Sequence, residues 1–237
     1  MTELLKLIQN RHSSRGRFDS KRHISKEDLK MILEAARWAP TAHNMQNYEI
    51  IVIDDDKVIE TIAQIESMIS EEFIRENFEQ LCFSEEDLKI KRVGILGNQF
   101  PPNWRDSSKL DEAIKERTPI PLSFTIRGSN TILIVIYDGR KRAPASEGDV
   151  LGFISLGCMM ENIWLMAQAL GISVHIMSAF NGVEEELRKV FKFPDYMNIG
   201  FSLKLGYPIS EATKYLRVRR EIDSFTHHNM YGNKWID

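Results

Sequence analysis

The sequence predicts one three-layer domain of the α/β or α+β class. Strand-like apolar runs alternate with amphipathic or apolar helical patterns along the chain. The strand-like runs cover residues 48–53, 131–137, 172–177 and 198–205. Helical patterns outnumber these runs, which favours helices packed around one sheet. The chain contains no internal repeat, low-complexity tract or linker, so we expect a single domain over residues 1–237.

The composition excludes several classes of protein. The 237 residues are 43% hydrophobic and 27% charged, which is ordinary for a globular core that needs no disulfide or metal. A net charge of −3 does not indicate a general nucleic-acid surface. The two cysteines, Cys82 and Cys158, belong to no CxxC motif or Cys/His cluster. We therefore expect buried thiols in a reducing compartment and no structural zinc.

The first helical pattern ends at a basic segment. Thr2 can cap a helix that runs to about Asn10. Residues 11–15, Arg-His-Ser-Ser-Arg, then place two guanidinium groups, two hydroxyls and an imidazole in one short stretch. Such donors suit a phosphate dianion. Taken alone, the basic residues of this stretch are better explained as complementing the dipole of the preceding helix. Only the rest of the chain makes phosphate binding the better explanation.

A second helix and a polar loop precede the first strand. Ser25, with an acidic residue three positions later, is a capping signature. Apolar residues at 29, 32, 33 and 36 give this helix one buried face, and Pro40 ends it. The polar segment 39–48 leads into the strand. After it, helical patterns cover residues 57–68 and 71–81, and another begins at Ser84.

The segment from about residue 94 to 128 shows little regular pattern. Such length inside a compact domain is typical of a lid or a binding loop. A surface excursion packed by its own aromatic side chains explains it equally well. Phe100, Trp104 and Phe124 are the aromatic residues that we consider for substrate contact.

Residues 149–170 form the most apolar helical pattern. Asp149 opens it and Gly171 closes it. Polar residues such as Glu161 and Asn162 interrupt the pattern, so we expect a buried helix rather than a membrane span. Because it is apolar nearly all round, it belongs at the centre of the core or at a subunit interface. The N-terminus carries no signal-peptide pattern.

Taken together, these segments resemble the nitroreductase family. Residues 11–15 are similar to its Arg-x-Ser-x-Arg/Lys motif, and residues 39–48 to its Pro-Ser-x-x-Asn-x-Gln-Pro-Trp loop. That loop departs from the family at Thr41, Asn47 and Tyr48. The long helix before Gly171, the Gly-Tyr-Pro of residues 206–208 and the basic tail also match in order. The resemblance implies an α+β fold with a mainly antiparallel sheet and FMN at the interface of a homodimer. With the reduced cysteines and no signal-peptide pattern, we expect a cytoplasmic protein.

The resemblance also implies roles for individual residues. Arg11, Ser13 and Arg219 would bind the FMN phosphate, with Arg217 as second choice, and Arg15 would face the N1–C2=O edge. A backbone N–H among Met177, Ser178 and Ala179 would donate to N5. The remaining contacts would come from His12 and, across the interface, from Pro40, Thr41, Ala42 and Asn44.

Each assignment has a simpler alternative. The arginines at 217–220 could form a solvated basic tail, as charge runs usually do. Ser178 and Ala179 could be no more than a turn, and Asn44 could satisfy backbone groups of its own loop. The histidines are not at metal-ligand spacing, so we expect no metal site.

The activity implied by the resemblance is the passage of two electrons from NAD(P)H, through flavin N5, to an electron-poor small molecule such as a nitroaromatic or a quinone. No nucleic-acid or membrane partner is expected. Two alternatives stay open. One is another flavin chemistry on the same fold, either reductive dehalogenation or fragmentation of the flavin. The other is a flavin-binding protein without turnover. The acceptor, and the choice between NADH and NADPH, are left open by the sequence.

Overall fold

The computed structural model describes residues 2–81, 106–144, 146, 148–209, 219 and 221–235. The chain groups into two compact units, which we describe separately. Unit 1 comprises Met1–Met68 and Pro119–Ala212, and unit 2 comprises Ile69–Thr118 and Thr213–Asp237. The single-domain organisation with an inserted lid stays a prediction. Several predicted features lie outside the described residues, namely Cys82, the helix from Ser84, residues 94–105 with Phe100 and Trp104, Arg217 and Arg220.

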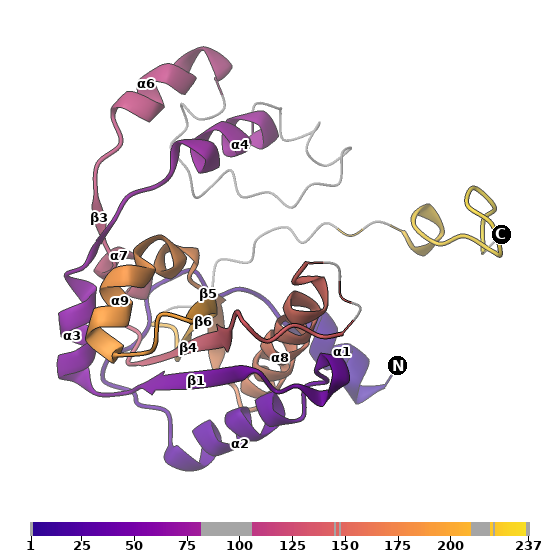
Figure 1. Ribbon diagram of the computed structural model, residues 1–237, viewed down its shortest axis with the longest axis horizontal. Helices are drawn as coiled ribbons and strands as arrows, with labels where there is room; N and C mark the ends of the chain where they lie inside the picture. The colour runs from indigo at the N-terminus through magenta and orange to yellow at the C-terminus, as the bar shows by residue number, and fades with distance from the viewer. Residues whose placement is uncertain are drawn as a thin grey trace. The chain divides into compact units, whose positions relative to one another are not determined.

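Unit 1 is built on a four-stranded sheet in which every pairing is antiparallel (Figure 1). The strands, in their order across the sheet, are β1 (Tyr48–Ile53), β4 (Thr131–Asp138), β6 (Met197–Gly206) and β5 (Ser173–Ile176). The central strand β4 is buried on both faces, as its continuous apolar run predicted. The antiparallel α+β class is therefore confirmed. The strand β5 forms one edge of the sheet.

Helices cover both faces of this sheet (Figure 1). One face packs against α2 (Lys26–Arg37) and α8 (Val150–Ala169), and the other against α3 (Asp56–Ala63), α7 (Ser123–Ile126) and α9 (Glu184–Phe191). Unit 1 also contains α1 (Glu3–Asn10), the 3-10 helices η1 (Ala42–Asn44) and η4 (Ser178–Val183), and the small strands β2 (Glu66–Ser67) and β3 (Ile120–Pro121). This arrangement gives the three layers that the sequence predicted.

Capping residues position the helices where the sequence predicts them. The Thr2 hydroxyl accepts a hydrogen bond from the Leu5 amide, and the Ser25 hydroxyl accepts one from the Asp28 amide. Gly171 follows α8 with a φ of +72°, a conformation that glycine adopts readily.

The helix predicted over residues 57–68 is shorter than expected. It ends at Ala63 because residues 66–67 pair with β3, a tertiary contact that overrides helical propensity.

The long helix α8 is a core helix on one side only. Its buried residues pack into the cluster shared with α2 and the sheet. By length and composition alone α8 could span a membrane, but a core helix satisfies the same criteria. On its other side Val150, Phe153 and Ile154 are exposed, and nothing lies within 4 Å of a Cβ built on Gly152 or Gly157.

Unit 2 has a small core of its own. It contains α4 (Glu71–Leu81), η3 (Ser107–Lys109), α6 (Leu110–Lys115) and η5 (Ile222–Ser224). Ile74 and Phe78 of α4 pack with Ala113 of α6.

The expectation of little regular structure over 94–128 was wrong for its described part. That part contains η3, α6, β3 and α7, whose turns are too short for a clear periodic pattern in the sequence.

Candidate functional site

The basic segment 11–15 lies along the outer edge of the sheet. Ser13 forms a parallel bridge with Val174 of β5, and the Ser14 amide donates to the Val174 carbonyl at 2.9 Å. An edge strand offers unpaired backbone groups, and this segment uses them as a short extra strand would. We call residues 11–19 the arm. Val174, which pairs with the arm, precedes Met177 by three positions in the chain. Met177 begins the loop that is predicted to contact flavin N5.

The first part of the arm is held by α8. The Arg11 Nε lies 3.3 Å from a carboxylate oxygen of Glu161, and its guanidinium lies 4.8 Å from the centre of the Trp164 ring. The indole N–H of Trp164 donates to the His12 carbonyl at 3.2 Å. The His12 ring nitrogen Nδ1 faces the Asn10 carbonyl, so this imidazole turns back toward α1. The guanidinium of Arg11 is thus oriented by neighbours on another element.

Arg127 was not identified from the sequence, yet it contacts the arm directly. Its Nη1 donates to the Arg15 carbonyl at 3.1 Å, and its Nε donates to the Phe124 carbonyl at 2.9 Å. The guanidinium also lies 4.6 Å from the centre of the Phe124 ring, which is 59% exposed. Nothing in the local pattern marks a single arginine after a four-residue helix, so only the tertiary structure reveals it.

The last part of the arm is anchored by backbone groups. The Phe18 amide donates to the Arg127 carbonyl, and the Asp19 amide to the Tyr207 carbonyl. Gly128, with a φ of +80°, and Gly206 allow the backbone of residue 18 and its ring to approach closely. The Gly-Tyr-Pro motif therefore holds the arm in place.

Three polar residues lie on one face of β5 and β6, where Lys204 and Ser202 are buried and His175 is half-buried. Lys204 is paired with His175 in the antiparallel register, and Ser202 is two positions along the same strand. The Ser202 hydroxyl and the His175 Nδ1 are buried without a hydrogen-bond partner among the described residues. A lysine and a serine within the apolar run of residues 197–206 are a signal that the sequence contained and that sequence reasoning missed.

The buried setting shifts both titratable groups toward their neutral forms. Burial, and after it the positive charge of Arg127, lower the pKa of Lys204 to about 7. Burial also lowers the pKa of His175 to about 3, with added repulsion from Lys204, Arg15 and Arg127. His175 is therefore neutral at pH 7, and the positive charge of this region belongs to the lysine and the two arginines.

The predicted N5 loop lies beside this buried group. The Met177 amide already donates to the Ser202 carbonyl at 2.9 Å, as part of the sheet. Ser178 is exposed, and the Ala179 carbonyl accepts a hydrogen bond from the Ser67 hydroxyl. Of the three candidates, Ser178 and Ala179 have the amides that the strand does not use.

The predicted partner-facing loop has an unusual backbone. His43, Asn44 and Gln46 all have positive φ, between +42° and +53°. Non-glycine residues with this conformation are uncommon and cluster at functional sites. Thr41 closes the turn, with its carbonyl accepting from the Asn44 amide and its hydroxyl from the Gln46 amide. Pro40 is exposed at the start of this loop.

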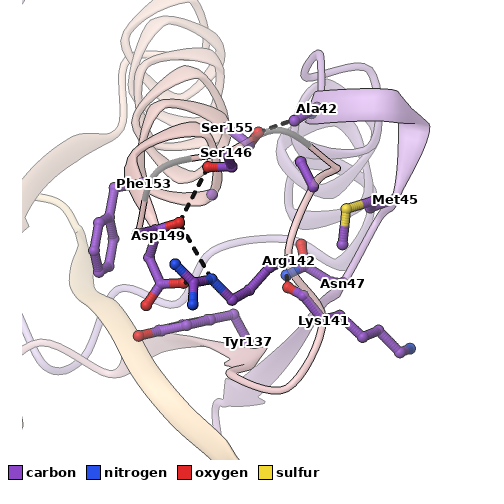
Figure 2. A pocket seen from close by; sticks show the side chains of 13 residues that line it. Ala42, Met45, Asn47, Tyr137, Lys141, Arg142, Ser146, Asp149, Phe153 and Ser155 are labelled. Carbon is purple, nitrogen blue, oxygen red and sulfur yellow. Dashed lines mark hydrogen bonds and ion pairs between the residues drawn. The ribbon is translucent and has the colours of Figure 1, made fainter.

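The loop is tied to α8 beside a small cavity (Figure 2). The Ala42 amide donates to the Ser155 hydroxyl at 3.0 Å, and Arg142 and Asp149, which also line the cavity, form an ion pair. The cavity volume is about 20 Å³. That volume accommodates roughly one water molecule, so this cavity is part of the packing and not a ligand site.

A larger hollow lies beside the same loop. Its volume is about 580 Å³, and it is lined by Arg37, Trp38, Ala39, Pro40, Thr41, Asn44 and Gln46. Trp38 is 72% exposed, and its indole N–H is fixed by the Glu34 carboxylate. This hollow is large enough for a small aromatic molecule.

The structure does not bring every predicted residue together. No hydrogen bond joins the loop 40–46 to the arm among the described residues. Arg219 belongs to unit 2, so its place relative to the arm stays a prediction. Within the described part of the chain, no group of three or more His, Cys, Asp or Glu side chains could hold a metal ion.

Comparisons with known proteins agree with this architecture. The model of the Nitroreductase family matches residues 8–207. Among curated proteins, an NADPH-dependent oxidoreductase of Staphylococcus aureus (strain USA300) is 22% identical over 98% of this chain and 75% of its own length. Its counterpart in strain N315 is 23% identical over 95% of this chain and 72% of its own length.

Solved structures share the fold. A nitroreductase family protein from Clostridium difficile 630 has a TM-score of 0.62, with 17% identity over 97% of this chain and 99% of its own. An FMN-bound nitroreductase from Bacteroides fragilis has a TM-score of 0.59, with 18% identity over 95% and 98%. An FMN-bound nitroreductase from Desulfitobacterium hafniense has a TM-score of 0.58, with 24% identity over 96% and 99%. With the family model covering most of the chain, the protein belongs to the nitroreductase family.

Proposed function

We propose that this protein passes two electrons from NAD(P)H, through bound FMN, to an electron-poor small molecule such as a nitroaromatic or a quinone. Family membership and the curated relatives make it an NAD(P)H-dependent oxidoreductase, and the FMN-bound structures of the same fold identify the cofactor. The identity of the acceptor and the residues of the site are our proposal.

The arm is the observation that carries this proposal. It carries Arg11, Ser13 and Arg15 in one segment whose backbone pairs with the edge strand β5. This donor set fits FMN, because a phosphate dianion needs cations and short donors, and the polar edge of the ring needs a nearby positive charge. Arg11 and Ser13 would bind the phosphate, with His12 packed beside them, and Arg15 would face the ring edge. When bound, FMN supplies the electron-transfer chemistry.

The chain's other groups would orient the cofactor. Ser178 or Ala179 would donate a backbone N–H to N5, since the Met177 amide is already engaged in the sheet. Arg127, which fixes the Arg15 carbonyl, would add a second positive charge near the ring. Arg219 would join the phosphate from the tail, and Arg217 is the alternative.

Two exposed apolar surfaces of unit 1 support a homodimer. The helix α1 is amphipathic but buries none of its residues, so Leu4, Leu5 and Ile8 remain uncovered. The exposed side of α8 adds Phe153 and Ile154. Apolar surfaces of this kind mark protein–protein interfaces. In the dimer, the loop residues Pro40, Thr41, Ala42 and Asn44 would reach the partner's FMN.

The acceptor would be selected by aromatic surfaces. Phe124 is exposed and stacked on Arg127, and the hollow beside Trp38 lies next to the partner-facing loop. These features favour a flat, electron-poor aromatic molecule. Phe100 and Trp104 remain candidates for the same role. We further propose that the protein is cytoplasmic and that it has neither a nucleic-acid nor a membrane partner.

The decisive experiment is a visible absorption spectrum of the purified protein, followed by anaerobic addition of NADH or NADPH. A flavin spectrum that bleaches with NAD(P)H and returns with a nitroaromatic or a quinone is expected. Protein that binds FMN but does not react with NAD(P)H would favour dehalogenase, flavin-fragmenting or carrier chemistry. Protein that rejects FMN would contradict the proposal.

The oligomeric state has its own test. Sedimentation velocity should show a dimer, and Phe153→Asp should dissociate it, because a charge is costly within an apolar interface. Lys189→Asp, which changes an exposed residue of α9, is the control and should remain dimeric. A folded, FMN-loaded monomer at micromolar concentration would contradict the dimer.

A further inference from the structure

We propose that Lys204 is a positioning residue of the flavin site. Its ammonium group fixes the Arg15–Gly16 part of the arm and keeps a positive charge behind it that favours reduced over oxidised FMN. The inference rests on the proposed function and deepens it, because it assigns a role to a residue on the central sheet rather than on the arm.

Lys204 has a complete set of acceptors inside the protein. Its side chain is 0% exposed, and its Nζ donates to the carbonyls of Thr125 at 2.9 Å, Ile126 at 3.4 Å and Gly16 at 3.4 Å. An ammonium group has three donors, so all of them are used. The Phe18 ring covers the group, with its centre 4.8 Å from Nζ. Lysine is almost never buried this fully.

The contacts of Lys204 complement those of Arg127. Arg127 donates to the Arg15 carbonyl and Lys204 donates to the next carbonyl, that of Gly16. Two cations from different elements therefore hold consecutive peptide groups of the arm. A displacement of Lys204 would move the backbone that carries the Arg15 guanidinium.

Among the described residues, no acidic side chain neutralises the charge on Lys204. The charged or titratable groups that act on it are His175 on β5 and Arg127 after α7, and Arg15 on the arm acts on His175 in turn. His175 is neutral at pH 7, so the net charge of the group is positive. An anion at the arm supplies the missing counter-charge, and the ring edge of FMN becomes more negative on two-electron reduction.

A purely structural role makes a different prediction. If Lys204 only satisfied carbonyls at the end of α7, its removal would weaken oxidised and reduced FMN equally. If it also supplies charge, its removal would weaken the reduced form more. The ratio of the two dissociation constants therefore separates the roles, whatever happens to the stability of the fold.

The test compares wild-type protein with Lys204→Met and with Lys189→Met, a matched loss of one exposed lysine in unit 1. Dissociation constants of oxidised and reduced FMN are measured anaerobically at pH 6 and pH 9. At pH 6 we expect Lys204→Met to weaken reduced FMN roughly tenfold more than oxidised FMN. That change corresponds to a midpoint potential lower by about 30 mV for a two-electron couple. Lys189→Met should leave the ratio unchanged.

The pH series adds a signature that a structural role lacks. Since the pKa of Lys204 is lowered to about 7, the difference between wild type and Lys204→Met should be large at pH 6 and lost at pH 9. Equal weakening of both FMN forms, or a difference that does not depend on pH, would overturn the proposal. Wild-type protein that binds no FMN would instead refute the proposed function.

A second measurement uses wild-type protein only, so it tests the proposal even if Lys204→Met does not fold. Lysine-labelled wild-type protein is titrated by NMR with oxidised and then with reduced FMN bound. By linkage, a tenfold preference for reduced FMN requires the pKa of Lys204 to be about one unit higher in the reduced complex. An identical titration in both complexes would overturn the proposal.

Discussion

The arm and the loop 40–46 are both predicted to contact FMN, but they are built differently. The arm is bonded through its backbone to β5, to Arg127 and to the segment after β6. The loop bonds mainly to itself, and α8 holds it through a hydrogen bond from the Ala42 amide to the Ser155 hydroxyl. Three loop residues have positive φ, whereas no arm residue does.

The difference indicates two kinds of contribution to a site. A segment that shares backbone hydrogen bonds with the sheet is as rigid as the sheet, and it can present charges at fixed positions. A short loop with a costly backbone conformation keeps that conformation only when its surroundings determine it. We infer that the arm belongs to the cofactor site of its own subunit and that the loop is completed by contacts from a partner.

The largest effect at neutral pH should come from breaking the anchor of the arm. Gly128→Ala would force an L-residue to a φ of +80° and place its Cβ 2.8 Å from the Phe18 carbonyl oxygen. We expect a loss of about 3 kcal/mol in the free energy of unfolding, measured by urea denaturation. Gly16→Ala is the control on the arm, because nothing lies within 4 Å of its Cβ, and it should change stability by less than about 0.5 kcal/mol. Equal effects would show that the arm is not anchored at Gly128.

Removing a charge from the arm should affect binding rather than folding. Arg11→Met is expected to raise the FMN dissociation constant about 10- to 100-fold, since hydrogen bonds to charged groups are worth a few kcal/mol. Fluorescence titration with FMN measures this. Arg17→Met removes an exposed arginine of the same arm and should change the constant little. If both variants bind FMN equally, the arm does not hold the phosphate.

His175, on the strand β5 that pairs with the arm, should make the free energy of unfolding depend on pH. Because the pKa of His175 is about 3 in the folded protein and near 6.5 when unfolded, the unfolded state takes up the proton first as pH falls. The free energy of unfolding should therefore fall by up to about 1.4 kcal/mol per unit between pH 6.5 and 3. His175→Leu should flatten this slope in acid denaturation monitored by circular dichroism. His43→Asn, in the exposed loop, should leave the slope as in the wild type.

The smallest effect on the fold should come from the loop. Asn44→Gly keeps the φ of +53° accessible and removes one exposed hydrogen bond to Gln46. We expect a change below about 0.5 kcal/mol in the free energy of unfolding. If the loop faces the partner's FMN, the KM for the acceptor should still change. A large loss of stability with an unchanged KM would mean that the loop is only a structural turn.

Much of the fold could be predicted because its signals are local. The strand of residues 48–53, the cap at Ser25 and the glycine after α8 each depend on neighbouring residues, and the structure confirms them. The helix predicted over residues 57–68 fails where a long-range pairing competes with propensity. The described turns within 94–128 are shorter than the window over which periodicity can be detected.

The candidate site also contains residues that the sequence reveals and residues that only the tertiary structure reveals. Residues 11–15 and the loop 39–48 stand out because several functional residue types occur together in a short stretch. Arg127 and His175 stand alone in the sequence, and only the packing of α7 and β5 against the arm gives them a role. Lys204 is an intermediate case, because a lysine within a buried strand is visible in the sequence but its three carbonyl acceptors are not.

The sequence by itself determined the order of the helices and strands, the family and the basic segment 11–15. These depend on patterns within a few residues or on the order of several motifs. The tertiary structure decided which charges converge on the arm and which amides of residues 177–179 the sheet leaves unused. It also decided which titratable groups lose contact with water. These properties depend on contacts between residues more than a hundred positions apart, such as Gly16 and Lys204, which no local pattern can specify.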